Sequence, residues 1–111
     1  MPTVNQRLFA PVQLGTALAT LFTATGKVLI DSLTLCNTTG GTITGVELHI
    51  VPSGGSASNT TMVISNRSLL AAETYRCPEL IGHTLENGEF VQARAGTAAS
   101  ISARGSGRVT S

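Results

Sequence analysis

Apolar and polar residues alternate with a period of two along most of the chain, between short segments rich in Gly, Asn and Ser. No window carries apolar residues at helical spacing for three turns. A period of two puts alternate side chains on opposite faces of a strand, whereas a helix needs a period near 3.6. The pattern predicts an all-β protein, with strands over residues 16–22, 27–37, 42–51, 61–66, 73–77, 89–95 and 99–111.

The strand expected over residues 27–37 changes the parity of its apolar positions halfway along. These positions are Val28, Ile30, Leu33 and Leu35. Successive side chains on a regular strand point to opposite faces, so the first two would face one way and the last two the other. A β-bulge near Asp31 and Ser32 adds one residue and turns all four side chains to the same face. We therefore expect a bulge there.

The sequence TTGG at residues 38–41 predicts a hairpin between this strand and the next one, residues 42–51. The apolar face of that next strand holds Val46, Leu48 and Ile50. Glu47 and His49 fall on the opposite face, which we expect to be solvated. Pro52 has no N–H for a sheet ladder, so the strand should end before it, and a Gly- and Ser-rich surface loop follows.

The later part of the chain is less regular. A strand is expected over residues 73–77, followed by one helical turn that begins at Pro78. The final strand, residues 99–111, contains Gly105 and Gly107. Glycine weakens the interior of a strand, so we expect an interruption at these two positions.

Seven or eight short strands separated by turn signals predict a single small β-sandwich, because a sheet with one apolar face needs a second layer to cover it. The strand path is either jelly-roll-like or immunoglobulin-like, and the sequence leaves both open. A chain of 111 residues fits one domain. We place this domain at residues 16–111, with residues 1–15 as an extended N-terminal arm.

The arm contains prolines and is apolar, which suits an extended segment better than a central strand. An exposed apolar segment needs a neighbour to cover it. The residues expected to contact a partner are Arg7, Leu8, Phe9, Pro11, Val12 and Leu14. Deleting residues 1–14 should then leave the β core folded and weaken partner binding. The alternative is that this segment is the first strand of the sandwich itself.

Charged residues make up 12% of the chain, about half the usual share, and the formal net charge is +1. Six of the seven basic residues are arginine, a bias typical of interfaces. A surface of Thr, Ser, Ala and Gly can be covered by protein without the cost of desolvating charges. This composition favours a protein that is covered in an assembly, although Thr-rich strands can also stay solvated because of their β propensity. The low net charge argues against a nucleic-acid partner.

Candidate catalytic and metal-binding residues are few and scattered. The chain has two His, two Cys and six carboxylates, and no Ser lies in a G-x-S-x-G motif. Glu47 and His49 are two possible metal ligands without a third. Arg104 and Arg108 could touch a phosphate or a carboxylate of a partner, but the chain has few aromatic residues for stacking on bases. We predict a protein that is not an enzyme and has no cofactor, metal site or catalytic residues.

The remaining sequence features bear on the cellular compartment in which the protein is made. No apolar run is long enough for a signal peptide or a membrane span, which predicts synthesis in a cytoplasm and no membrane partner. Cys36 and Cys77 are therefore expected to be free thiols. The sequons at Asn37, Asn59 and Asn66 are interpreted as turn chemistry, and His83 as a surface residue of a loop.

Two stretches carry a resemblance to a known family. SLTLCNTTGGTITGVELHIVPSGG and AAETYRCPELIGHTLENGEFVQARAG resemble small virion proteins of tailed bacteriophages, in which an apolar strand ends in C-N-T and A-x-E-T-Y and L-x-x-G-x-x-V-Q-A follow. The resemblance covers roughly residues 28–95. The C-N-T match falls on Cys36, Asn37 and Thr38, and the A-x-E-T-Y match begins at Ala71; all of these are structural positions.

The chain is most similar to head decoration or cement proteins, in particular the staple protein of epsilon-fifteen-type short-tailed phages. The resemblance implies a protein on the outer capsid surface of the virion that bridges neighbouring major capsid protein subunits and stabilises the DNA-filled head. A homodimer or other symmetric oligomer would suit that role. Alternatives are a neck or tail-completion protein, a fibre-associated protein, a module that binds the host surface and, more distantly, a small enzyme.

Overall fold

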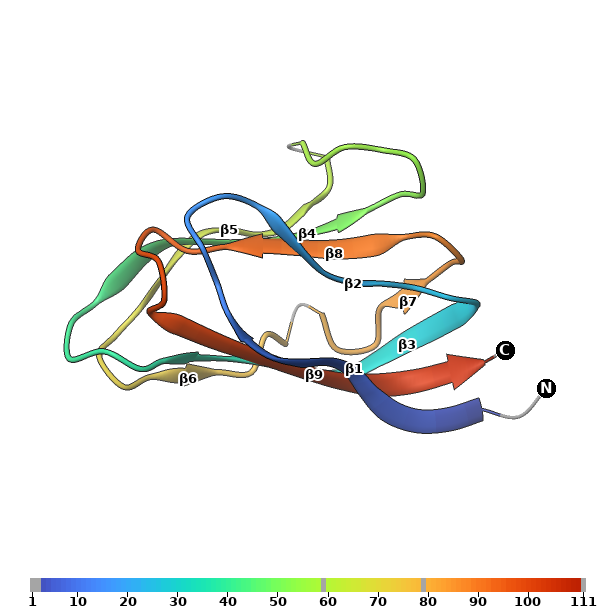
Figure 1. The fold of residues 1–111 in the computed structure, drawn as a ribbon, viewed down its shortest axis with the longest axis horizontal. Helices are drawn as coiled ribbons and strands as arrows, with labels where there is room; N and C mark the ends of the chain where they lie inside the picture. The colour runs from blue at the N-terminus through green and yellow to red at the C-terminus, as the bar shows by residue number, and fades with distance from the viewer. Residues whose placement is uncertain (1–2, 59, 79, 111) are drawn as a thin grey trace.

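The computed structural model describes residues 3–58, 60–78 and 80–110 (Figure 1). These residues form nine strands and no helix, so none of their segments is a helix that could cross a membrane. The strands are β1 (Thr3–Gln13), β2 (Ala19–Thr23), β3 (Lys27–Asn37), β4 (Ile43–Val51), β5 (Met62–Leu69), β6 (Thr74–Tyr75), β7 (Thr84–Leu85), β8 (Phe90–Arg94) and β9 (Ile101–Thr110). The all-β prediction is confirmed.

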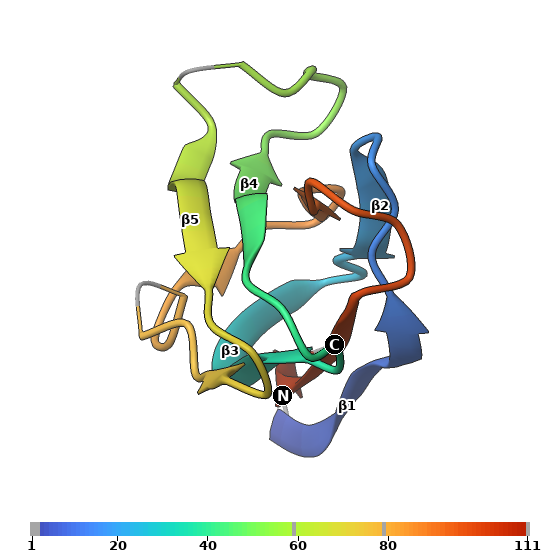
Figure 2. The ribbon, with the colours of Figure 1, turned by 90° about the vertical axis from the view of Figure 1, so that its left-hand side faces the viewer.

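The strands form two antiparallel sheets packed face to face (Figures 1 and 2). Sheet A has the order β1-β9-β3-β6, with β7 also paired to β3. Sheet B has the order β2-β8-β4-β5. Figure 2 shows β1 and β2 at one side of the sandwich and β5 at the other. The predicted β-sandwich is confirmed.

The strand pairs nest within one another along the chain. β4 pairs with β5, β3 with β6 and β7, β2 with β8, and β1 with β9. This is one long antiparallel ribbon that turns at the loop after Pro52. Rolling the ribbon up brings β9 beside β3 and β8 beside β4, which gives the path of a jelly roll. In an immunoglobulin-like path the last two strands share a sheet, whereas β8 and β9 lie in different sheets. The structure therefore has the jelly-roll path and not the immunoglobulin-like one.

The core lies between the sheets and is built from the inward faces of both. The bulge predicted in β3 is confirmed, since the pairing with β9 shifts register between Ile30 and Ser32. The four apolar residues predicted to share one face of β3 are all buried: Val28, Ile30, Leu33 and Leu35. Each is at most 2% exposed, as a strand needs when both of its halves face the same core.

The segment predicted as an N-terminal arm is an edge strand of the sandwich. β1 pairs with β9 from Thr3 opposite Thr110 to Gln13 opposite Ser102. The alternative considered from the sequence, a first strand of the sandwich, is the arrangement in the structure. Proline is compatible with it because an edge strand leaves one row of N–H groups unpaired. Deleting residues 1–14 would uncover the whole edge of β9, so the truncated chain is not expected to keep its fold.

Three local predictions are wrong, and a fourth, the strand over residues 73–77, is confirmed only in part. The TTGG segment is not the turn of a hairpin, because β3 and β4 lie in different sheets. The chain crosses there from one layer to the other, which is how a jelly roll connects successive strands. No helical turn follows Pro78 among the described residues, and the strand expected over residues 73–77 is only β6. β9 runs through Gly105 and Gly107 without interruption.

Candidate partner-binding surface

The described residues contain no group of three or more His, Cys, Asp or Glu side chains that could hold a metal ion. Glu47 and His49 do lie together on β4, but His49 is only 3% exposed, so its prediction as a solvated side chain is wrong. Its Nδ1 lies 2.8 Å from Oγ1 of Thr61, and its Nε2 lies 3.4 Å from Oε1 of Glu47. Arg94 completes the cluster with an ion pair of 3.0 Å to Glu47.

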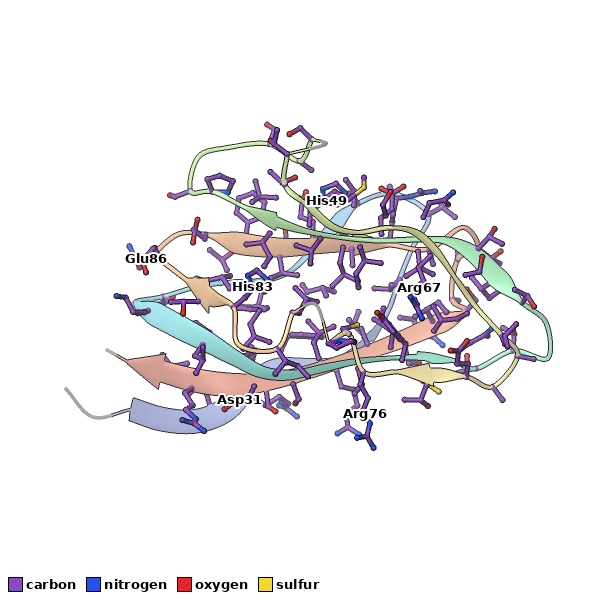
Figure 3. All side chains as sticks on the ribbon, turned by 180° about the vertical axis from the view of Figure 1, so that it is seen from behind. Asp31, His49, Arg67, Arg76, His83 and Glu86 are labelled. Carbon is purple, nitrogen blue, oxygen red and sulfur yellow. The ribbon has the colours of Figure 1, made fainter. Side chains whose placement is uncertain are left out.

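This cluster is structural. Thr61 lies at the end of the loop that follows Pro52, and its hydroxyl also accepts from the N–H of Ser58 and donates to the Ser58 carbonyl. The contact with Thr61 therefore ties the loop to β4, and the folded-over loop explains why His49 is covered (Figure 3). His83, by contrast, is exposed, as predicted.

Asn37 is a second buried polar group, and it accounts for the C-N-T motif. Its Oδ1 accepts from the N–H and the hydroxyl of Thr39, at 2.9 and 2.7 Å. Its Nδ2 donates to the carbonyls of Gly41, Leu69 and Leu70, at 2.8 to 3.1 Å. The side chain joins the end of β3, the crossover and the end of β5, which confirms its interpretation as turn chemistry. Cys36 and Cys77 are not joined by a disulfide, as predicted.

Two grooves flank β1. The first, which we call the arginine groove, lies on the outer face of sheet A and has a volume of about 380 Å³. It is lined by Arg7, Ser32, Thr34, Arg104, Gly105 and Ser106. The second, which we call the edge groove, lies where β1 and β2 form one side of the sandwich and has a volume of about 330 Å³. It is lined by Phe9, Val12, Gln13, Leu14, Gly15, Ala19, Thr20, Leu21 and Ala93.

The arginine groove depends on two bulges. β3 bulges between Ile30 and Ser32, and β1 shifts register between Arg7 and Phe9. Both shifts fall beside the Gly-Ser-Gly segment of β9 that includes Ser106. Bulges re-aim side chains, and here they place three residues in one row across three strands: Arg7 on β1, Ser106 on β9 and Ser32 on β3.

The same shift turns Phe9 inward. Phe9 lies opposite Gly105, and a Cβ atom built on that glycine would be 2.7 Å from Cε1 of the Phe9 ring. The ring fills the space above the glycine and forms part of the edge groove. On this groove Val12 is 42% exposed, whereas Leu14 is 3% exposed and belongs to the core.

The six residues predicted as partner contacts are therefore not equivalent. Arg7 is exposed in the arginine groove, Val12 is exposed in the edge groove, and Leu8 and Phe9 are half-buried against the core. Leu14 is buried, and the side chain of Pro11 lies outside the described residues. The sequence pattern gives no sign that Arg104 shares a groove with Arg7, nor that Leu21 shares one with Val12. The Ser-x-Arg-x-Ser-x-Arg alternation from Ser102 to Arg108 is the signal for the polar face of β9.

Comparisons with known proteins give one structural similarity. No protein-family model matches the chain, and no curated protein matches its sequence. One chain from a solved structure described as "Structure of infectious bursal disease virus Gx strain" superposes with a TM-score of 0.43 and 18% sequence identity. The superposition covers 96% of this chain and 31% of that chain, so the present chain spans about a third of its length.

Proposed function

We propose that this protein is a non-enzymatic structural protein of a phage virion that binds the outer surface of the capsid and staples neighbouring major capsid protein subunits. The observation that carries the proposal is the edge groove, an apolar depression of about 330 Å³ at the side of the sandwich, beside the exposed Val12. Exposed apolar surface of this kind is typical of protein interaction sites. The sequence resemblance to decoration proteins of tailed phages supports the same function.

Weak contacts suffice for such a role. Each copy needs only a modest contact with two capsid subunits, because many copies act together on one shell. The low share of charged residues, 12%, reduces the desolvation cost of covering this surface. The proposal includes a symmetric dimer, which would offer the same edge groove to both sides of a capsid symmetry axis. Light scattering that finds monomers both free and on shells would exclude the dimer.

The test is co-sedimentation of the purified protein with capsids of the parent phage from which it has been stripped. A staple should saturate at on the order of hundreds of copies per shell, whereas a neck or tail ring takes about a dozen at most. Val12→Asp should weaken binding by about tenfold or more, because it puts a charge into the apolar contact. Ile81→Asp is the matched control, since Ile81 is also exposed, at 49%, but lies between β6 and β7.

Two results would contradict the proposal. Saturation at a handful of copies would assign the protein to the neck, tail or fibre. Equal losses for Val12→Asp and Ile81→Asp, with both variants folded, would mean that the edge groove is not the contact surface.

A further inference from the structure

We propose that the arginine groove binds carboxylate side chains of an acidic segment on a partner protein. On the proposed function this partner is a capsid subunit, so the inference rests on that function for the identity of the partner only. The chemistry of the groove stands on the residues that line it.

Most cations of the described chain already have a partner. Arg94 pairs with Glu47 at 3.0 Å, Lys27 with Glu86 at 3.7 Å and Arg108 with Asp31 at 3.1 Å. The guanidinium of Arg67 lies 3.7 Å from the centre of the Tyr75 ring. Arg7, Arg76 and Arg104 make no ion pair with any described acidic residue. Of these three, Arg7 and Arg104 line the same groove, and Arg76 is not part of its lining.

The other polar groups of the groove are also donors. The hydroxyls of Ser32 and Ser106 are hydrogen-bonded to each other at 2.8 Å. One hydroxyl donates in that bond, so the hydrogen of the other is free to donate to a ligand. Thr34 adds a third hydroxyl, and the lining contains no carboxylate. A site with guanidinium and hydroxyl donors and no acidic group is complementary to an anion with several acceptor oxygens.

A protein carboxylate fits this site better than a nucleic acid. The planar fork of arginine matches a carboxylate with two parallel hydrogen bonds. A volume of about 380 Å³ is sufficient for one or two acidic side chains. The lining has no aromatic ring on which a base could stack, and a net charge of +1 gives little long-range attraction to a polyanion.

The arginine groove and the edge groove both border β1, so one partner could contact both grooves at the same time. Arg7 faces the arginine groove and Phe9 faces the edge groove, and the two residues are separated by one position on β1. A partner that covers this edge of the sandwich would meet an apolar surface on one side of β1 and a cationic one on the other. The apolar contact would supply affinity, and the arginines would select an acidic partner and its orientation.

The experiment uses the full chain labelled with ¹⁵N and a capped hexaglutamate peptide as the probe, with capped hexaglutamine as the neutral counterpart. Hexaglutamate should cause saturable NMR shifts in the Nε–Hε groups of Arg7 and Arg104 and in the backbone N–H of Ser106, and hexaglutamine should not. The double variant R7A/R104A should raise the Kd for hexaglutamate by about tenfold. R7K/R104K keeps both charges but loses the fork, so its Kd should fall between the two.

Lys27→Glu is the matched control, because it changes the net charge by the same amount as R7A/R104A at an exposed site away from the groove. Its Kd should stay within about twofold of the unmodified protein, in line with a weak screened interaction. Equal weakening by Lys27→Glu, equal shifts with hexaglutamine, or tighter binding of a thymidine oligonucleotide than of hexaglutamate would each overturn the inference. Because the probe is a peptide, failure of capsid binding would refute the proposed function while the peptide result stands.

Discussion

The rings of Phe9 and Phe22 stack with their centroids 6.0 Å apart and their planes 9° from parallel. Phe9 belongs to β1 in sheet A and Phe22 to β2 in sheet B. The pair therefore connects the two sheets at the side of the sandwich where the edge groove lies. Phe9 also covers Gly105, so this one ring joins three strands.

Phe9→Ala should lower the free energy of unfolding by about 2 to 3 kcal/mol, because it removes a half-buried aromatic ring and leaves the space above Gly105 empty. Urea unfolding followed by circular dichroism measures the change. Val12→Ala, on the same strand but 42% exposed, should cost at most about 0.5 kcal/mol. A loss of the same size in both variants would contradict the inward orientation of Phe9.

Gly107→Ala should destabilise the fold strongly, by about 2 to 3 kcal/mol, because the added Cβ would collide with the backbone carbonyl oxygen of Leu29. Backbone on a neighbouring strand cannot move aside as a side chain can. Gly40→Ala is the control, since nothing lies within 4 Å of a Cβ at that position. Thermal unfolding of the two variants should separate them clearly, and similar melting temperatures would show that β9 and β3 approach less closely than described.

Asn37→Ala should cost about 2 kcal/mol, because it removes the Asn37 partner of the buried Leu69 carbonyl and of the part-buried N–H of Thr39. Asn37→Asp should cost more at neutral pH, since a carboxylate would face the carbonyl oxygens that Nδ2 now contacts. Burial raises the pKa of a carboxyl group, so the protonated form is favoured in the folded state.

The stability of Asn37→Asp should therefore be highest at low pH and fall as the pH rises above about 3.9, the ordinary pKa of Asp. Urea unfolding of the Asn37→Asp variant at pH values below and above this pKa measures the change in stability. Thr42→Asp adds the same charge at an exposed position of the same crossover and should change little. A stability of Asn37→Asp that does not depend on pH beyond that of Thr42→Asp would contradict the network.

Thr61→Val should release the loop after Pro52, because the Thr61 hydroxyl contacts His49 at 2.8 Å and also bonds Ser58. We expect faster proteolysis within this loop and a loss of about 1 to 2 kcal/mol. Thr60→Val removes only an exposed contact with the Ser58 side chain and should leave the cleavage rate unchanged. Equal protection in both variants would mean that the loop is held by other contacts.

The sequence was sufficient for features that depend on neighbours along the chain. The change of parity in β3 located its bulge and identified its four buried apolar residues, because inward orientation on a strand follows from spacing alone. The alternation in β4 likewise predicted that Val46 and Leu48 enter the core, and Ile50, predicted on the same face, is half-buried against it. It failed at His49, because this side chain is covered by the loop between β4 and β5, whose Thr61 contacts it.

Only part of the candidate surface was predictable in the same way. The sequence singled out Arg7 and Val12 as contact residues, but grouped them in one arm with the buried Leu14. Which side of β1 each residue faces depends on a register shift against β9, about a hundred residues away along the chain. The meeting of Arg7 with Arg104 depends on the same pairing.

The sequence by itself determined the all-β class, the β3 strand with its bulge and the sparse charge of the surface. All of these follow from local periodicity and composition. The tertiary structure alone decided that the TTGG segment crosses between layers, that residues 3–13 form an edge strand, and that the path is a jelly roll. The physical reason is that strand pairing joins residues far apart in the chain. An apolar face predicts that a strand is covered, but it does not predict which element covers it.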